Sequence, residues 1–137
     1  MTKLVVDASV ALAWTLSTQK TSAADALRVL ANIEFVAPFI FVYEVRNALR
    51  KAEREKRISG ADADQALAEF DTVMEVVEPP DEASIADALK LARDCNLSFY
   101  DANYVELARR IGCTLATRDG PMIAAAPKAG IAIYDAR

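Results

Sequence analysis

The sequence predicts an α/β fold: a three-layer α/β/α domain with a central parallel sheet of about five short strands. Apolar runs of strand length alternate with longer segments in which apolar residues recur every three or four positions. That order is typical of parallel strands joined by right-handed helical crossovers. The strand runs are short and apolar, as a sheet covered on both faces requires. We expect residues 1–137 to form a single domain.

The elements of the first half follow from local signals. The run 4–6 is a strand that leads into a helix at about 9–16, and Thr21 or Ser22 caps the helix within 21–32. A strand within 33–38 stops at a proline, and apolar residues at helical spacing predict a helix at about 39–56. Ser59 caps the helix that follows, within 59–74.

The second half continues the alternation. A short strand within 75–80 stops at two prolines, and 82–96 is helical. The next helix begins near Ser98 and ends at Gly112, a residue suited to the left-handed backbone that closes many helices. A buried strand at 113–117, a short helix within 119–130 and a last strand at 131–135 complete the chain.

Composition narrows the class of function. The chain contains no histidine, which excludes Ser-His and Cys-His nucleophile pairs and histidine zinc ligands. Cys95 and Cys113 lie far apart and are expected to be reduced core residues. No secretory leader pattern is present, and no apolar run reaches the roughly 18–20 residues that a membrane span needs. We therefore expect a cytoplasmic protein with no membrane partner.

A basic segment contrasts with the formal net charge of −4. The stretch RNALRKAEREKR contains Arg46, Arg50, Lys51, Arg54, Lys56 and Arg57. A solvated helix face with ion pairs to Glu53 and Glu55 is the simpler interpretation. A stripe that contacts phosphates is the alternative.

Two acids lie just after predicted strands. Asp7 ends the first apolar run, and Asp119 comes just after the run 113–117. The carboxyl ends of parallel strands meet at one edge of the sheet, which is where ligands bind in such folds. Asp119 also fits an N-cap ahead of the Gly-Pro that follows it, and Thr117 is a second cap or a hydroxyl near a metal.

Two further acids interrupt apolar helix faces. Glu44 shares its face with Phe41 and Val45, and Asp101 shares its face with Tyr104. Taken singly, an arginine partner explains Glu44 and a capping box explains Asp101. Tyr104 itself is expected to be a core or dimer-surface aromatic, because it lies on an apolar stripe.

Taken together, the four acids predict a metal site. Carboxylates that converge in one pocket repel one another unless a cation lies among them or protons are shared. Oxygen ligands favour Mg²⁺ or Mn²⁺, and such a site is suited to phosphodiester hydrolysis. In this hypothesis Asp7, Asp101 and Asp119 hold Mg²⁺, directly or through water, and Glu44 ligates the ion or orients the attacking water.

The segments LVVDASVALAW, APFIFVYEVRNAL, LSFYDANYVELA and LATRDGPMIAAAPKAGI occur in an order that resembles the PIN-domain ribonucleases, and more closely the VapC-type toxins of type II toxin–antitoxin systems. The resemblance covers essentially the whole chain. It implies a PIN-like fold with the acidic site at Asp7, Glu44, Asp101 and Asp119, supported by Ser9, Asn47 and Thr117. Some members carry another acid shortly after the fourth. Here Gly120, Pro121 and Met122 follow, so this acid, which bears on a second metal position, is missing.

The resemblance also implies an activity and partners. The implied activity is that of a Mg²⁺-dependent endoribonuclease, with Mn²⁺ as a substitute. Such an enzyme cuts structured RNA such as tRNA or rRNA and halts translation. The protein would be a homodimer inhibited by a cognate antitoxin, and it would reach operator DNA only through that antitoxin. Arg46, Arg50 and Arg118 are candidates to contact RNA phosphates or to stabilise the transition state.

Other functions share this fold class. A receiver-like signalling domain resembles this chain in its acidic pocket, but has adjacent acids after the first strand and a lysine at the end of the last. Here Asp7 stands between Val6 and Ala8, and the last strand ends in IYDAR. A phosphatase with an aspartyl nucleophile would have a second aspartate at position 9, where Ser9 stands. A non-catalytic binding protein remains open, although all four acids are present.

Overall fold

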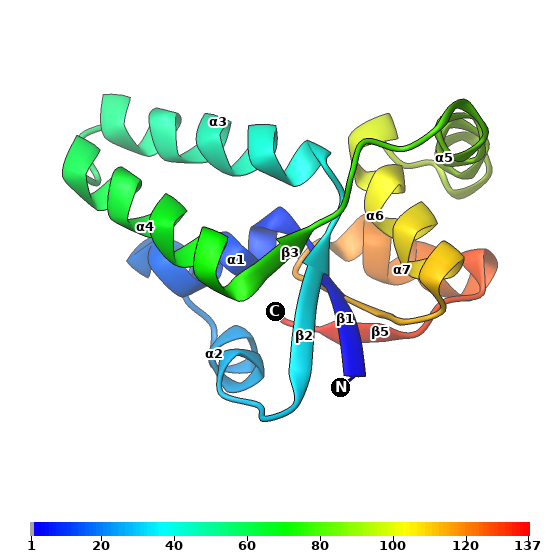
Figure 1. Cartoon of the computed structure of the whole chain (residues 1–137), viewed down its shortest axis with the longest axis horizontal. Coiled ribbons are helices and arrows are strands. Elements are labelled where there is room, and N and C mark those ends of the chain that lie inside the picture. The colour runs from blue at the N-terminus through cyan, green and yellow to red at the C-terminus, as the bar shows by residue number, and fades with distance from the viewer. Residues whose placement is uncertain (1) are drawn as a thin grey trace.

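A computed structural model describes residues 2–137 as a five-stranded sheet between two layers of helices (Figure 1). The strands are β1 (Thr2–Val6), β2 (Ile33–Ala37), β3 (Met74–Val76), β4 (Thr114–Thr117) and β5 (Ile133–Asp135). They lie in the order β3-β2-β1-β4-β5, and each neighbouring pair is parallel. The predicted three-layer α/β/α fold is confirmed.

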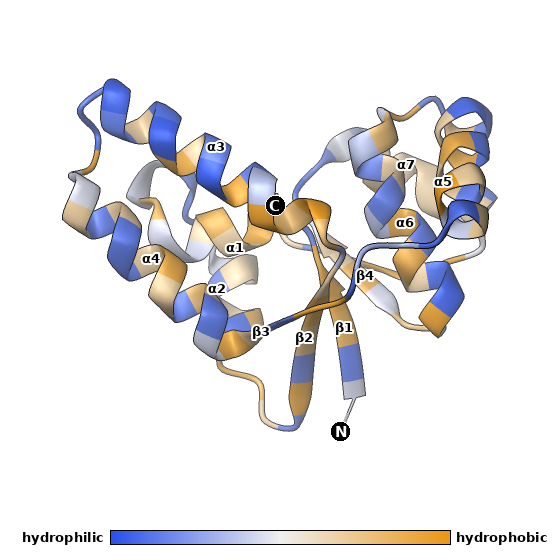
Figure 2. Ribbon diagram, turned by 45° about the horizontal axis from the view of Figure 1, so that its top comes forward, coloured by the Kyte–Doolittle hydropathy of each residue, from blue (hydrophilic) through white to orange (hydrophobic). Residues whose placement is uncertain are grey.

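The helices divide into two groups. The first half of the chain forms α1 (Ala8–Thr15), a short 3-10 helix η1 (Ser17–Gln19), α2 (Ser22–Arg28), α3 (Ile40–Arg54) and α4 (Gly60–Val73). The second half forms α5 (Glu82–Cys95), α6 (Phe99–Ile111) and α7 (Gly120–Ala129). Figures 1 and 2 show α1–α4 on one side of the sheet and α5–α7 on the other.

Caps confirm the predicted starts of three helices and the predicted end of one. The side chains of Thr21, Ser59 and Ser98 accept hydrogen bonds from the backbone N–H groups of the first turns of α2, α4 and α6. Gly112 ends α6 with a φ of 68°, in the left-handed region that favours glycine. Cys95 and Cys113 are free thiols, as expected. Within residues 2–137, no helix has the length and apolar character that crossing a membrane requires.

The centre of the sheet determines where a ligand site can form. β1 and β4 are neighbours in the middle of the sheet, with Val6 paired to Ala116. Their buried residues are apolar except for Thr117 at the end of β4, and Figure 2 shows β1 and β2 as apolar towards their carboxyl ends with hydrophilic segments nearer their starts. The chain leaves β1 through α1 and α2 towards β2, and leaves β4 through α7 towards β5 on the opposite side. Strand order therefore reverses between β1 and β4, and the carboxyl ends of these two strands are the expected ligand-binding edge.

Candidate acidic active site

Asp7 lies at the carboxyl end of β1 and is the N-cap of α1. It is only 5% exposed. One carboxylate oxygen, Oδ1, accepts the Ser9 N–H at 3.1 Å, and Oδ2 accepts the hydroxyls of Ser9 at 3.1 Å and Thr117 at 2.6 Å. All three donors are neutral, so the charge on Asp7 is hydrogen-bonded without being neutralised.

The pKa of Asp7 reflects this environment. The pKa is raised from the ordinary value of 3.8 to about 6, mainly by burial and in smaller part by the negative charge of Asp101, against the opposing effect of the Thr117 and Ser9 hydrogen bonds. At neutral pH the side chain is therefore mainly an anion held in a buried setting that disfavours negative charge. A cation beside it would relieve that cost.

The turn after β4 is tied directly to Asp7. The fully buried Thr117 hydroxyl donates to Asp7 and accepts the backbone N–H of Asp119 at 2.9 Å. Asp119 is the N-cap of α7, where its Oδ2 accepts the Met122 N–H at 2.9 Å. The predicted cap is therefore confirmed, and it fixes the Asp119 carboxylate at the same edge of the sheet as Asp7.

Glu44 reaches this edge from the second turn of α3. It is partly buried, and its carboxylate Oε1 accepts the hydroxyl of Tyr104 on α6 at 2.6 Å. Burial raises the pKa of Glu44, and the negative charges of Asp7 and Asp101 raise it further against the Tyr104 hydrogen bond. An arginine partner, the simpler explanation for this acid, is not found among the ion pairs of residues 2–137.

Asp101 lies in the first turn of α6 and is partly buried. Its backbone N–H donates to the Ser98 hydroxyl at 3.1 Å, so the serine cap is present. Burial raises the pKa of the Asp101 carboxyl, the charge of Asp119 raises it further, and the Ser98 hydroxyl lowers it. Asp101 therefore takes part in a cap through its backbone while its side chain faces the charge of another predicted site residue.

The causes of the raised pKa values of Asp7, Glu44 and Asp101 link the four acids into one electrostatic cluster. Asp101 acts on Asp7, both act on Glu44, and Asp119 acts on Asp101. Among the ion pairs of the described residues, none involves any of the four. We define these four residues, Asp7, Glu44, Asp101 and Asp119, as the acidic cluster.

The chemistry of the acidic cluster fits a hard divalent cation. Its donors are all carboxylate oxygens, the type that Mg²⁺ and Mn²⁺ prefer, and within residues 2–137 none of them forms an ion pair with lysine or arginine. Over residues 2–137, the structure contains no group of three or more His, Cys, Asp or Glu side chains already close enough to hold a metal ion. The fit therefore rests on donor type, burial and uncompensated charge.

The supporting residues predicted from the sequence divide into two sets. Ser9 and Thr117 contact Asp7 directly, and the Ser9 hydroxyl also accepts the Arg118 N–H at 3.2 Å. Asn47, by contrast, is exposed on α3. The position that the resemblance assigned to Asn47 therefore lies outside the buried part of the site.

The three candidate arginines also differ in their contacts. Arg46 and Arg50 are exposed on α3, where Arg46 donates to the Val42 carbonyl at 3.0 Å and Arg50 pairs with Glu53 at 3.2 Å. That pair, and the one between Arg57 and Glu55, confirm the expected ion pairs of the basic segment. Arg118 is partly buried and bonds Gln19 through Nη1 at 3.3 Å, while its buried Nε has no partner within the described chain.

Sequence reasoning missed the polar role of Tyr104. The residue is fully buried, as predicted for a core aromatic, but its hydroxyl bonds Glu44. Burial raises its pKa well above the ordinary 10, and the charges of Glu44 and Asp7 raise it further, so the phenol stays protonated and donates. The available signal was a tyrosine in place of phenylalanine at a buried position, because a buried tyrosine hydroxyl usually needs a partner.

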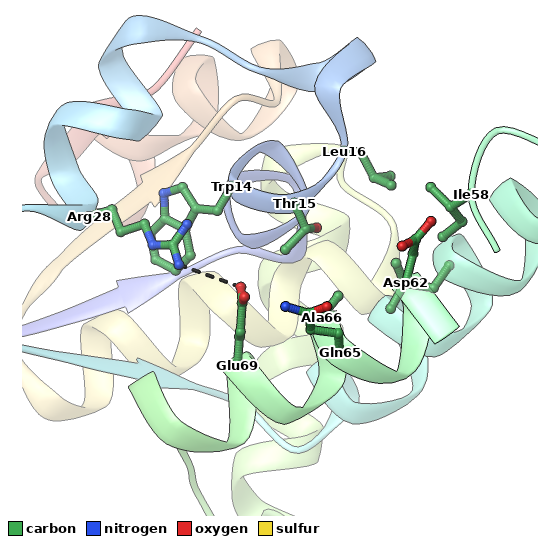
Figure 3. Close-up of a pocket in the computed structure, with 10 residues that line it drawn as sticks. Trp14, Thr15, Leu16, Arg28, Ile58, Asp62, Gln65, Ala66 and Glu69 are labelled. Atoms are coloured by element: carbon green, nitrogen blue, oxygen red, sulfur yellow. Dashed lines mark hydrogen bonds and ion pairs between the residues drawn. The ribbon is translucent and has the colours of Figure 1, made fainter. Parts of the chain in front are cut away.

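A depression of about 330 Å³ lies away from the acidic cluster, between the end of α1, α2 and α4 (Figure 3). Trp14 and Leu16 contribute apolar surface to it, and the ion pair between Arg28 and Glu69 spans 3.5 Å at its rim (Figure 3). None of the four acids lines this depression. It is therefore separate from the candidate active site.

Comparison with known proteins identifies the family of the chain. The PIN domain family model matches residues 4–127. The VapC ribonuclease Mb0985 of Mycobacterium bovis is 31% identical over 116 residues, which are 85% of each chain. The exonuclease VapC9 of Pyrobaculum aerophilum is 34% identical over 83 residues, which are 61% of this chain and 60% of that protein.

Two solved structures share the fold. PAE2754 from Pyrobaculum aerophilum aligns with a TM-score of 0.72 and 27% identity over 90% of this chain and 84% of that one. VapBC2 from Rickettsia felis, solved on a DNA fragment from its promoter, aligns with a TM-score of 0.72 and 13% identity over 97% of this chain and 98% of that one, a likeness of fold alone. The chain belongs to the PIN-domain family, and proteins named VapC are among its relatives.

Proposed function

We propose that this chain is a divalent-metal-dependent endoribonuclease and the toxin of a toxin–antitoxin pair. The observation that carries the proposal is the acidic cluster, in which carboxylates from four separate elements, each a predicted site residue, come to the switch point of the sheet. There the charge of Asp101 raises the pKa of Asp7, and the charge of Asp119 raises the pKa of Asp101. Relatives named as ribonucleases support the reaction class.

In this proposal Asp7, Glu44, Asp101 and Asp119 hold Mg²⁺, with Mn²⁺ as a substitute. The bound ion would supply Lewis-acid stabilisation of charge on the phosphate and would make a water molecule more acidic. The chain supplies no further acid at positions 120 to 122, so the cluster gives one cation position more support than two.

The protein's own groups then have distinct tasks. Thr117 and Ser9 fix the orientation of Asp7, and the α7 cap fixes Asp119. Glu44 has one oxygen engaged by Tyr104, which leaves the other to accept a proton from the attacking water or to bind the cation. Arg46, Arg50 and Arg118 are the candidates to bind RNA phosphates.

The partners belong to the same proposal. RNA is the substrate, with tRNA or rRNA as the expected targets, and a cognate antitoxin inhibits a homodimer of the chain. The formal net charge of −4 favours DNA contact only through such a partner, since direct DNA binding usually needs a basic surface. The Rickettsia felis neighbour, solved as a complex on promoter DNA, supports this arrangement by analogy.

An RNA-cleavage assay tests the proposal. The chain, purified free of any partner, is incubated with total cellular RNA in Mg²⁺, in Mn²⁺ or in EDTA, beside Asp7→Asn and the control Asp64→Asn. Asp64 is an exposed acid on α4 and is outside the cluster. We expect the wild type to produce discrete fragments only when metal is present. Asp7→Asn should cleave RNA at least about 100-fold more slowly, while Asp64→Asn should cleave at the wild-type rate. Equal cleavage by all three proteins would reject the acidic cluster as the active site.

A further inference from the structure

The hydrogen bond between Tyr104 and Glu44 joins two helices over the acidic cluster. Tyr104 projects from α6 and Glu44 from α3, 60 positions apart in the sequence, and the two oxygens are 2.6 Å apart. Figures 1 and 2 show α3 and α6 on opposite sides of the sheet's central strands, with their first turns towards one another. The bond therefore spans the gap between the two helix layers at the edge that bears the acids.

The direction of this bond is fixed by chemistry. A carboxylate has no proton to give, so the phenol donates and Glu44 Oε1 accepts. Tyr104 is 0% exposed, so water does not compete for its hydroxyl. Glu44 is only partly buried and, without this donor, its flexible side chain could turn outward into solvent.

The Tyr104 ring is itself held rigidly. It lies one helical turn after Asp101 on α6, and its neighbours Val105 and Ala108 on that helix are fully buried. A donor anchored in the core can fix a carboxylate more precisely than a surface residue can. The bond also uses only one oxygen of Glu44, so Oε2 stays available to a cation or a water molecule.

We propose that Tyr104 is a positioning residue that holds the Glu44 carboxylate in place at the acidic cluster, with one oxygen engaged and one oxygen left to act. The inference deepens the proposed function and rests on it. Tyr104 then affects cation binding and the chemical step, and both effects act only through Glu44.

The competing explanation is purely structural: the bond ties α3 to α6 and contributes only to stability. A matched control separates the two. Tyr134 is a partly buried tyrosine whose hydroxyl donates to the Ala23 carbonyl at 2.8 Å, away from the acids. Tyr134→Phe therefore removes a tyrosine hydrogen bond of similar length without touching the cluster.

The first experiment compares Tyr104→Phe, Tyr134→Phe and wild type by thermal unfolding, Mn²⁺ titration calorimetry and RNA-cleavage kinetics. We expect both variants to fold and to lose stability. Tyr104→Phe alone should bind Mn²⁺ about 10-fold more weakly and lower kcat about 10-fold or more, with KM for RNA unchanged. Equal Mn²⁺ affinity and kcat in the two variants would overturn the positioning role.

A double-mutant cycle tests whether the effect passes through Glu44. In a Glu44→Ala background, Tyr104→Phe should cause no further loss of Mn²⁺ affinity, because the group that it positions is gone. A full additional loss would overturn the proposal. Wild-type protein that binds Mn²⁺ without cleaving RNA would reject the proposed function while the Mn²⁺ cycle still decides the role of Tyr104. Wild-type protein that binds no Mn²⁺ would reject both.

Discussion

Thr117 donates its hydroxyl to Asp7 across a distance of 2.6 Å, and so joins the carboxyl ends of β4 and β1 although the two residues are 110 positions apart. The same hydroxyl accepts the backbone N–H of Asp119. One buried oxygen atom thus connects two acids of the proposed site. Its removal should affect both.

Thr117→Val keeps the shape of the side chain and removes this oxygen. We expect a loss of about 1–3 kcal/mol in the free energy of unfolding, because a buried carboxylate oxygen and a backbone N–H each lose a partner. We also expect weaker Mn²⁺ binding and slower RNA cleavage. Urea denaturation and calorimetry measure these effects. Thr117→Ser keeps the hydroxyl and should retain Mn²⁺ affinity; a loss equal to that of Thr117→Val would show that packing, and not the hydrogen bond, matters.

The raised pKa of Asp7 predicts a pH-dependent stability. Its folded-state pKa of about 6 exceeds the ordinary 3.8, so the folded state binds the proton more tightly. This contribution is fully present below about pH 3.8 and is lost as the pH rises through about 6. Above that range, ionised Asp7 lowers the free energy of unfolding of the metal-free protein by about 3 kcal/mol relative to the protonated form. This figure follows from the rise of the pKa from 3.8 to about 6.

Asp7→Asn imitates the protonated form and should therefore stabilise the metal-free protein at pH 8. The gain should shrink as the pH falls towards 4, where the wild-type carboxyl is largely protonated. Urea unfolding in EDTA at several pH values measures it. A gain that stayed constant or grew on acidification would contradict burial as the cause of the shift.

Gly112 closes α6 with a φ of 68°, and a Cβ at this position would meet no atom within 4 Å. Gly112→Ala should therefore lower stability by about 1 kcal/mol through backbone strain alone, with no change in cleavage. Gly60 begins α4 without a positive φ, and a Cβ there also has open space. Gly60→Ala should be neutral or slightly stabilising in the same thermal unfolding assay; equal losses in both variants would refute the strain argument.

Arg50 is the most testable of the proposed phosphate contacts, because it is exposed and its surface ion pair contributes little to stability. Arg50→Ala should raise KM for RNA severalfold, leave kcat unchanged and reduce the slope of log affinity against log salt by about one. Arg109 is exposed in the last turn of α6 and lines a depression with Thr2 and Thr114, which begin β1 and β4. If Arg109→Ala changed the slope as much as Arg50→Ala, the contact would not be specific to α3.

Much of the fold could be predicted because its signals are local. Apolar runs, a proline after β2 and caps such as Ser59 and Gly112 act within a few residues, and each marks a boundary that the structure confirms. The parallel order then follows from general rules of crossover handedness. Asp7 and Asp119 could be placed at one edge because both follow strands of the same sheet.

The rest of the site depends on how distant elements pack. The partner of Tyr104 lies on another helix, and only the packing of α3 and α6 onto the two sides of the sheet decides whether that hydroxyl meets a carboxylate or another acceptor. Asn47 is three residues after Glu44, so it is rotated by about 60° around the helix. That rotation is enough to leave Asn47 exposed while Glu44 is partly buried. The spacing of the two residues alone could not predict which of them would face the buried site.

The most direct test of the account is the thermal stabilisation of the protein by Mg²⁺ or Mn²⁺. Each acid of the cluster is replaced in turn by its amide, as Asp7→Asn, Glu44→Gln, Asp101→Asn and Asp119→Asn, with Asp64→Asn as the control. A cation that binds only the folded state raises Tm by mass action, by several degrees at ten times its Kd. The account predicts this rise for wild type and Asp64→Asn and a smaller or absent rise for each cluster variant. The same rise in all six proteins would show that the cation binds elsewhere and would contradict the central claim.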